Sequence, residues 1–128
     1  MTATLLLAGL LLFAPGLAHA QVAVEQIVGT WTGTVEYAST RMGPGGTTTA
    51  TLTIKPDGTW TGQSAVAGAP PAHGTYELKG NVARTVTLSS VPSGWGNTAT
   101  WTFAEKGGAW TMVSERDDKN TKGTYVKK

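Results

Sequence analysis

Few side chains in this sequence are of the types that carry out catalysis or bind metals. Beyond residue 20 the chain has one histidine, His73, and the whole sequence has no cysteine. Catalysis by a nucleophile, a base and an orienting acid needs several such groups held within mutual reach, and the spacing around His73 supplies none. Zinc sites draw mainly on cysteine and histidine. We therefore expect no enzyme, no metal site and no cofactor, with His73 exposed where a loop meets a strand.

The charged residues do not indicate a metal or nucleic-acid site either. Asp117 and Asp118 lie in the run 115–120, which lacks the regularly spaced oxygen ligands and the glycine of a calcium-binding loop. We expect a solvated turn there. The net charge is +2, and the lysines and arginines are scattered rather than gathered in one stripe. The sequence therefore predicts no binding of nucleic acid.

The aromatic side chains are the main candidates for a binding site. They fall on strand faces that we assign to the interior, and the set is Trp31, Trp60, Tyr76, Trp101, Phe103, Trp110 and Tyr125. Such rings can simply fill a core, since each buries about 150–250 Å², or they can form the wall of an apolar pocket. Both interpretations can hold if the domain is packed at one end and open at the other.

Arg84 is the charged candidate for the same site. By alternation it shares a face with Val82, Val86 and Leu88, and an unpaired charge is costly to bury. Its guanidinium can pair with a carboxylate such as that of Glu105, bind an acidic group of a ligand, or lie at a rim and reach water.

Two loops offer surfaces for a protein partner. Loop 39–46 carries Arg41, and loop 91–96 carries Trp95 between two glycines. An aromatic side chain on a glycine-rich loop can cover the mouth of a cavity, contact a partner or fold back onto the core.

A repeated tripeptide indicates the elements that position these residues. Gly29-Thr30-Trp31 returns in similar copies that begin at Gly58, Gly74 and Gly123. We interpret each copy as the start of a strand, where glycine lets the chain leave a turn and the aromatic residue two positions later faces the interior. Period-2 alternation extends over 27–37, 48–55, 59–66, 74–79, 82–89, 98–105, 109–115 and 123–127.

The connections between these stretches are short. Pro56-Asp57-Gly58 and Gly80-Asn81 predict tight hairpin turns, and no stretch has the period of a helix. The alternation also assigns Ile27, within the first strand, and Leu52, Val66, Leu78 and Met112 to the interior.

Eight antiparallel strands in sequence order predict an all-β fold, a single up-and-down barrel whose closure leaves no exposed edge. An interior of that size either fills with side chains or holds one small ligand. The outward faces are mostly threonine with lysine and glutamate, for example Thr30, Thr32, Thr34 and Glu36. These are poor neighbours for lipid, so we expect a barrel that is not integral to a membrane.

Residues 1–20 have the pattern of a secretory signal peptide. An apolar run over 5–12 is followed by Pro15-Gly16 and by Ala18-His19-Ala20, a small-x-small cleavage site. We expect cleavage near Ala20, export to the periplasm or the exterior, and one barrel domain over 21–128.

Gly29 and Trp31 on the first strand, followed by an antiparallel meander, resemble the calycin superfamily, and in particular bacterial lipocalin-like exported barrels. Trp101-Thr102-Phe103 is loosely similar to an avidin strand. The resemblance implies a small-ligand barrel and does not identify the ligand.

We expect a lipocalin-like exported barrel that binds a small, largely apolar or amphiphilic molecule without catalysis. The alternative is a barrel that binds a protein, for example an inhibitor, through the loops that carry Arg41 and Trp95.

Overall fold

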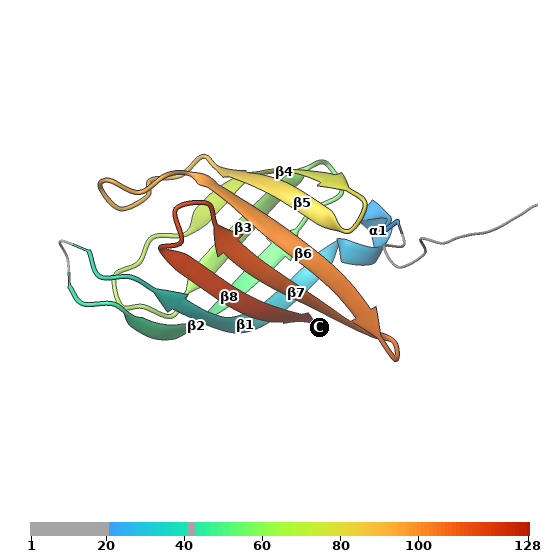
Figure 1. The fold of residues 1–128 in the computed structure, drawn as a ribbon, viewed down its shortest axis with the longest axis horizontal. Coiled ribbons are helices and arrows are strands. Elements are labelled where there is room, and N and C mark those ends of the chain that lie inside the picture. Colours follow the sequence, from blue (N-terminus) through green and yellow to red (C-terminus); the bar gives the residue numbers. More distant parts are fainter. Residues whose placement is uncertain (1–20, 41–42) are drawn as a thin grey trace, which may run out of the picture.

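A computed structural model of the chain describes residues 21–40 and 43–128. The predicted signal peptide and Arg41 lie outside the described residues. The described chain is one closed barrel of eight antiparallel strands in sequence order, in which β8 pairs with β1 (Figure 1). The strands are β1 (Gly29–Tyr37), β2 (Gly46–Ile54), β3 (Thr59–Ser64), β4 (Ala72–Lys79), β5 (Val82–Thr87), β6 (Thr98–Lys106), β7 (Ala109–Arg116) and β8 (Thr121–Lys127). The predicted all-β up-and-down barrel is confirmed.

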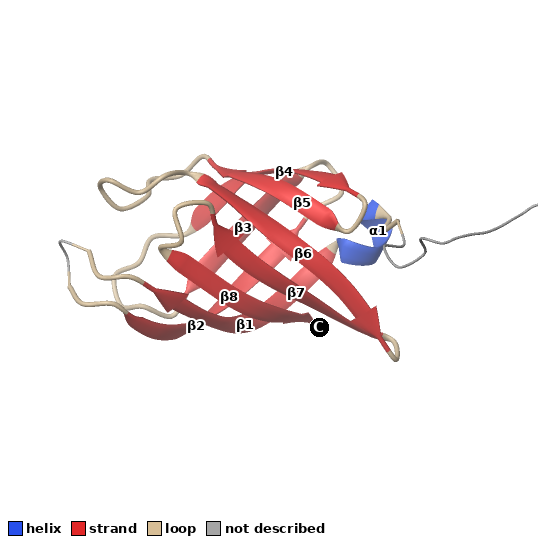
Figure 2. Cartoon of the chain, viewed as in Figure 1, coloured by secondary structure: helices blue, strands red, loops and turns tan. Residues whose placement is uncertain are grey.

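The two ends of the barrel differ in their connections. The tight turns after β2, β4 and β6 gather at one end, together with the short helix α1 (Val24–Ile27) and Lys128. We call this the helix end. The described residues of the connection 38–45, the connections 65–71 and 88–97, and the turn 117–120 gather at the opposite end, which we call the loop end (Figure 2).

Helix α1 closes the helix end, and the sequence did not predict it. Ile27 was assigned to the first strand, but it is the last residue of α1 and is fully buried. The indole Nε1 of Trp31 donates a buried hydrogen bond of 2.9 Å to the carbonyl of Ile27. A four-residue helix is too short to show a helical period in sequence, so the sequence pattern could not distinguish it from the start of a strand.

The predicted tight turns are present. At the β2–β3 turn Asp57 accepts hydrogen bonds from the backbone N–H and the hydroxyl of Thr59, at 3.0 and 2.6 Å. Gly58 takes the left-handed conformation with φ +87°, which glycine adopts without strain. Gly80-Asn81 joins β4 to β5, with Lys79 opposite Val82.

The predicted phase of β5 is wrong. Its buried face carries Ala83 and Thr85, whereas Arg84 is exposed. The two-residue turn is the reason. Because it places Leu78 opposite Ala83, and directly opposed residues of an antiparallel pair lie on the same face, the inward assignment of Leu78 forces Ala83 inward. The apolar residues Val82 and Val86 suggested the opposite phase.

Two apolar residues assigned to the interior lie beyond the ends of their strands. Val66 follows the end of β3 and is 38% exposed, and Leu88 follows the end of β5 and is 61% exposed. Alternation carries no information about facing once the strand pairing has ended.

The glycine–aromatic repeat has a second structural role. Gly29 begins β1 and Gly58 lies in a turn, as expected, but Gly74 and Gly123 lie inside β4 and β8. Gly74 is paired with Trp60 of the neighbouring strand. A Cβ atom on Gly74 would lie 1.9 Å from the carbonyl oxygen of Val86 and 2.8 Å from the Trp60 ring. Gly33, paired with Tyr125, is equally crowded, so these glycines make room for a ring from the next strand.

Replacing Trp31 by alanine should lower the free energy of unfolding by ~3–5 kcal/mol, because a fully buried ring is lost. Urea denaturation followed by circular dichroism measures the change. Val126→Ala is the control, since Val126 is exposed on β8 and should change stability by no more than about 0.5 kcal/mol. A loss below about 1 kcal/mol for Trp31→Ala would contradict the burial of this ring.

Gly74→Ala should destabilise the barrel by about 1–3 kcal/mol or more, because the added methyl group has no space beside the Val86 carbonyl. The matched variant is Gly96→Ala, whose Cβ would meet its nearest neighbour, Asp118 Oδ2, at 3.7 Å. The same urea titration compares them, and equal stability of the two variants would show that the strand spacing at Gly74 is wrong.

Candidate functional site

The predicted aromatic set forms a continuous packed cluster in the interior. Trp31 packs on Phe103 with ring centroids 5.5 Å apart, and Phe103 packs on Trp101 at 6.4 Å. Trp101 also contacts Trp60, at 5.7 Å, and Tyr76, at 6.3 Å. The structure therefore brings these five predicted residues together.

Trp110 and Tyr125 are the remaining two residues of the predicted set. Trp110 is partly buried and packs against the core. Tyr125 is 6% exposed, and desolvation raises the pKa of its hydroxyl to about 12. A phenol in such surroundings stays neutral throughout the physiological range.

On the inward face, the larger residues Val35 and Tyr37 of β1 lie toward the loop end, and six other inward positions carry small side chains. The pairing of the strands puts these positions on the same face as the aromatic cluster, and they are Ala50, Ser64, Ala72, Thr85, Ala99 and Ser114. Thr85, 2% exposed, donates from its hydroxyl to the carbonyl of Ala99 at 3.2 Å. Small and hydroxyl-bearing side chains thus share the inward face with the large rings.

Arg116 is a charged residue on the inward face, at the loop end of β7. It ends β7, in phase with the buried Met112 and paired with the buried Ala99. Its side chain is only 13% exposed. Among the described residues, its Nε and Nη2 atoms are buried without a hydrogen-bond partner.

Trp95 lies over Arg116, with the centre of the guanidinium 5.3 Å from the centroid of the ring. Asp118 helps to hold this loop, because its Oδ2 accepts a hydrogen bond of 2.8 Å from the backbone N–H of Gly96. Asp118 Oδ1 accepts from Asn120 N–H at 3.0 Å and lies 3.5 Å from Arg116 Nε. Hydrogen bonds from the Asn120 and Gly96 backbone and the nearby Arg116 lower the pKa of Asp118.

The alternation of β7 includes Arg116, but the predicted end of this strand excluded it. Met112 was correctly assigned inward, and two further steps of alternation reach Arg116. The strand was predicted to end at Glu115, one residue too early, so Arg116 was assigned to the solvated turn. Trp95 was expected to cover the mouth of a cavity, to contact a partner or to fold back onto the core. In the structure its ring lies over Arg116.

Arg84 lies on the outside of the barrel, which corrects its predicted position. Its guanidinium makes a bidentate ion pair with Asp117, at 3.1 and 2.8 Å. It does not pair with Glu105, which instead accepts from Gly108 N–H at 2.6 Å. Hydrogen bonds from Arg84 and Thr98 lower the pKa of Asp117 from 3.8 to about 2.

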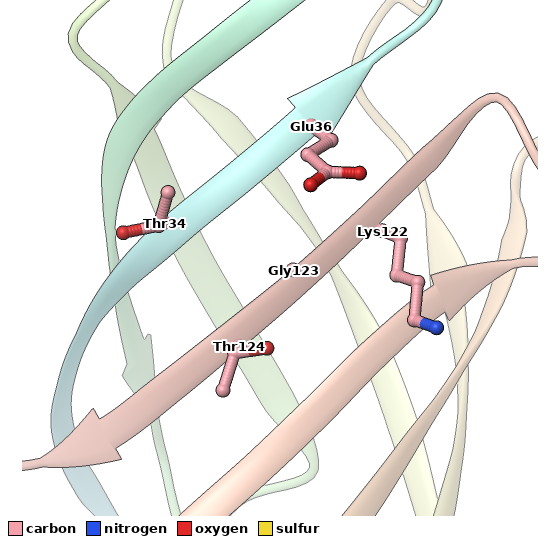
Figure 3. Close-up of a pocket in the computed structure, with 5 residues that line it drawn as sticks. All are labelled: Thr34, Glu36, Lys122, Gly123 and Thr124. Carbon is pink, nitrogen blue, oxygen red and sulfur yellow. The ribbon is translucent and has the colours of Figure 1, made fainter.

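A groove of about 220 Å³ lies on the outer wall between β1 and β8 (Figure 3). It is lined by Thr34, Glu36, Lys122, Gly123 and Thr124. Its side chains point away from the barrel axis. The register of β1 with β8 puts them on the outward face of the wall, whereas the aromatic cluster lies on the inward face. It is a surface feature separate from the interior site.

His73 is exposed on β4, and within residues 21–40 and 43–128 no three His, Cys, Asp or Glu side chains come together as metal ligands. None of the described helices is long and apolar enough to span a membrane. Comparison of the sequence with protein-family models and with curated proteins finds no match.

The Asp117 carboxylate should make part of the stability depend on pH. Its folded pKa is depressed, so its contribution is complete above the ordinary pKa and is lost as pH falls from about 4 to about 2. Asp117→Asn should therefore lower the Tm at pH 7, and the gap to the unchanged protein should narrow toward pH 2.

Thermal unfolding followed by circular dichroism across this pH range measures the gap. Glu36→Gln is the control, since Glu36 is an exposed carboxylate that makes no ion pair with the described residues. A gap for Asp117→Asn that stays constant with pH would show that the ion pair with Arg84 does not stabilise the fold.

Proposed function

We propose that this protein binds a small, largely apolar molecule inside the loop end of the barrel. The observation that carries the proposal is the composition of the inward face. Rings fill the core and α1 closes the helix end, whereas several inward side chains toward the loop end, those of Ala50, Ser64, Ala72 and Ala99, are small. A ligand-binding site typically combines an apolar floor with a few polar groups, and the two halves of this interior supply these parts.

Trp101 is the residue at which the two halves meet. It contacts the rings of Trp60, Tyr76 and Phe103, and it is paired with Ser114 of β7. A molecule that enters from the loop end would rest on this ring, which supports roles for Trp60, Tyr76 and Trp101 as the floor of the site. Trp31, Phe103 and Trp110 then support the floor and do not touch the ligand.

The loop that carries Trp95 supports the same direction of entry. Asp118 holds Gly96, the residue next to Trp95, and the indole ring covers an inward-facing arginine. A loop of this kind can cover a bound molecule and exclude water. We include in the proposal that the protein is exported and lipocalin-like, since a closed eight-stranded barrel is the architecture that lipocalins use.

A neutral, environment-sensitive naphthalene dye tests the proposal. The dye should bind one site per chain, its emission should shift to the blue, and tryptophan fluorescence should be quenched because the floor contains tryptophan. Ala50→Phe should abolish uptake by filling the loop end from an inward position of β2.

Thr49→Phe is the matched control, since Thr49 is the preceding residue of β2 and is exposed on the outside. Both variants are first shown to be folded by circular dichroism. Absence of dye uptake by the unchanged protein, together with specific capture of a protein through Trp95, would replace this proposal by the protein-binding alternative.

A further inference from the structure

The two unpartnered nitrogens of Arg116 belong to one edge of its guanidinium. Nε–H and the adjacent N–H of Nη2 point in parallel and form the fork that a carboxylate accepts through both of its oxygens. Both atoms are buried, and neither has a hydrogen-bond partner among the described residues. Buried donors are normally satisfied, and leaving a charged donor unsatisfied is especially unfavourable.

The neighbours of Arg116 do not supply the missing acceptor. Asp118 is the nearest carboxylate, but its Oδ1 is 3.5 Å from Nε, too far for a good hydrogen bond. Both of its oxygens already accept from backbone N–H groups, those of Asn120 and Gly96. Trp95 offers the face of a ring, which attracts a cation but cannot accept two parallel N–H bonds.

We propose that Arg116 binds the carboxylate of an amphiphilic acid, such as a medium-chain fatty acid, whose apolar part extends toward Trp101. The inference rests on the proposed function, because it needs a molecule inside the loop end. It identifies the acidic group of that molecule and the side chain that recognises it.

The charges around the site favour a single negative charge. Asp118 is ionised at neutral pH, since its pKa is lowered below 3.8, and it lies beside the guanidinium. A monoanionic carboxylate pairs with the unpartnered Nε–Nη2 edge with limited repulsion, whereas a phosphate dianion would meet the Asp118 charge at close range. The ligand class is therefore a carboxylic acid and not a phosphorylated lipid.

Decanoic acid and its neutral analogue decanol test this subsite by competition with the naphthalene dye at pH 7.5. The unchanged protein should bind decanoate more tightly than decanol. Arg116→Gln should weaken decanoate roughly ten- to hundredfold and leave decanol nearly unchanged, because only the charged hydrogen bonds are lost. Arg116→Lys, which keeps the charge without the fork, should give an intermediate affinity for decanoate.

Arg84→Gln is the matched control, because it removes an arginine from the outer wall, and it should leave both affinities unchanged. Decyl phosphate should compete more weakly than decanoate. Thermal unfolding of each variant checks that it is folded, and Arg116→Lys keeps the test decisive if Arg116→Gln does not fold.

The outcomes separate this inference from the proposed function. If decanol and the dye bind but Arg116→Gln and Arg116→Lys leave decanoate affinity unchanged, the barrel binds ligands and the carboxylate subsite is refuted. If neither the dye nor either decyl compound binds the unchanged protein, the proposed function itself is wrong.

Discussion

The buried hydrogen bond from the Trp31 indole to the Ile27 carbonyl ties the closing helix to the first strand of the barrel. It satisfies the polar atom of a fully buried ring and a carbonyl at the end of a helix that is too short to be stable alone. The ring then packs on Phe103, and Phe103 on Trp101. The position of the aromatic cluster follows from this contact.

The fold could be predicted because strand alternation and tight turns are local signals. Trp31, Leu52, Trp60 and Met112 were all assigned inward correctly, since each lies within a strand, where the alternation of side chains holds. Arg84 was misassigned because the outward face of β5 carries Val82 and is as apolar as its inward face. Only the pairing across the Gly80-Asn81 turn, a relation between two strands, distinguishes the faces.

The aromatic part of the candidate site was visible in sequence, and its charged part was not. Asp117 and Asp118 are consecutive and belong to one turn, yet one binds Arg84 on the outer wall and the other holds the Trp95 loop over Arg116. Sequence alone gives these two carboxylates the same description, a solvated turn. Their separate roles depend on where β7 ends, and a boundary shift of one residue decides whether Arg116 belongs to the wall or to the loop.

The ends of the described chain and the Trp95 loop lie at opposite ends of the barrel. The backbone N–H of Val22 bonds to the carbonyl of Gly80, and that of Lys128 bonds to the carbonyl of Thr30, so both of these residues lie at the helix end. A surface, reporter or neighbouring domain joined beyond either of these residues would stand behind the closed floor of the barrel. The Trp95 loop would face the opposite way, toward open solution. Tethering would therefore not hinder a diffusing molecule from reaching this loop.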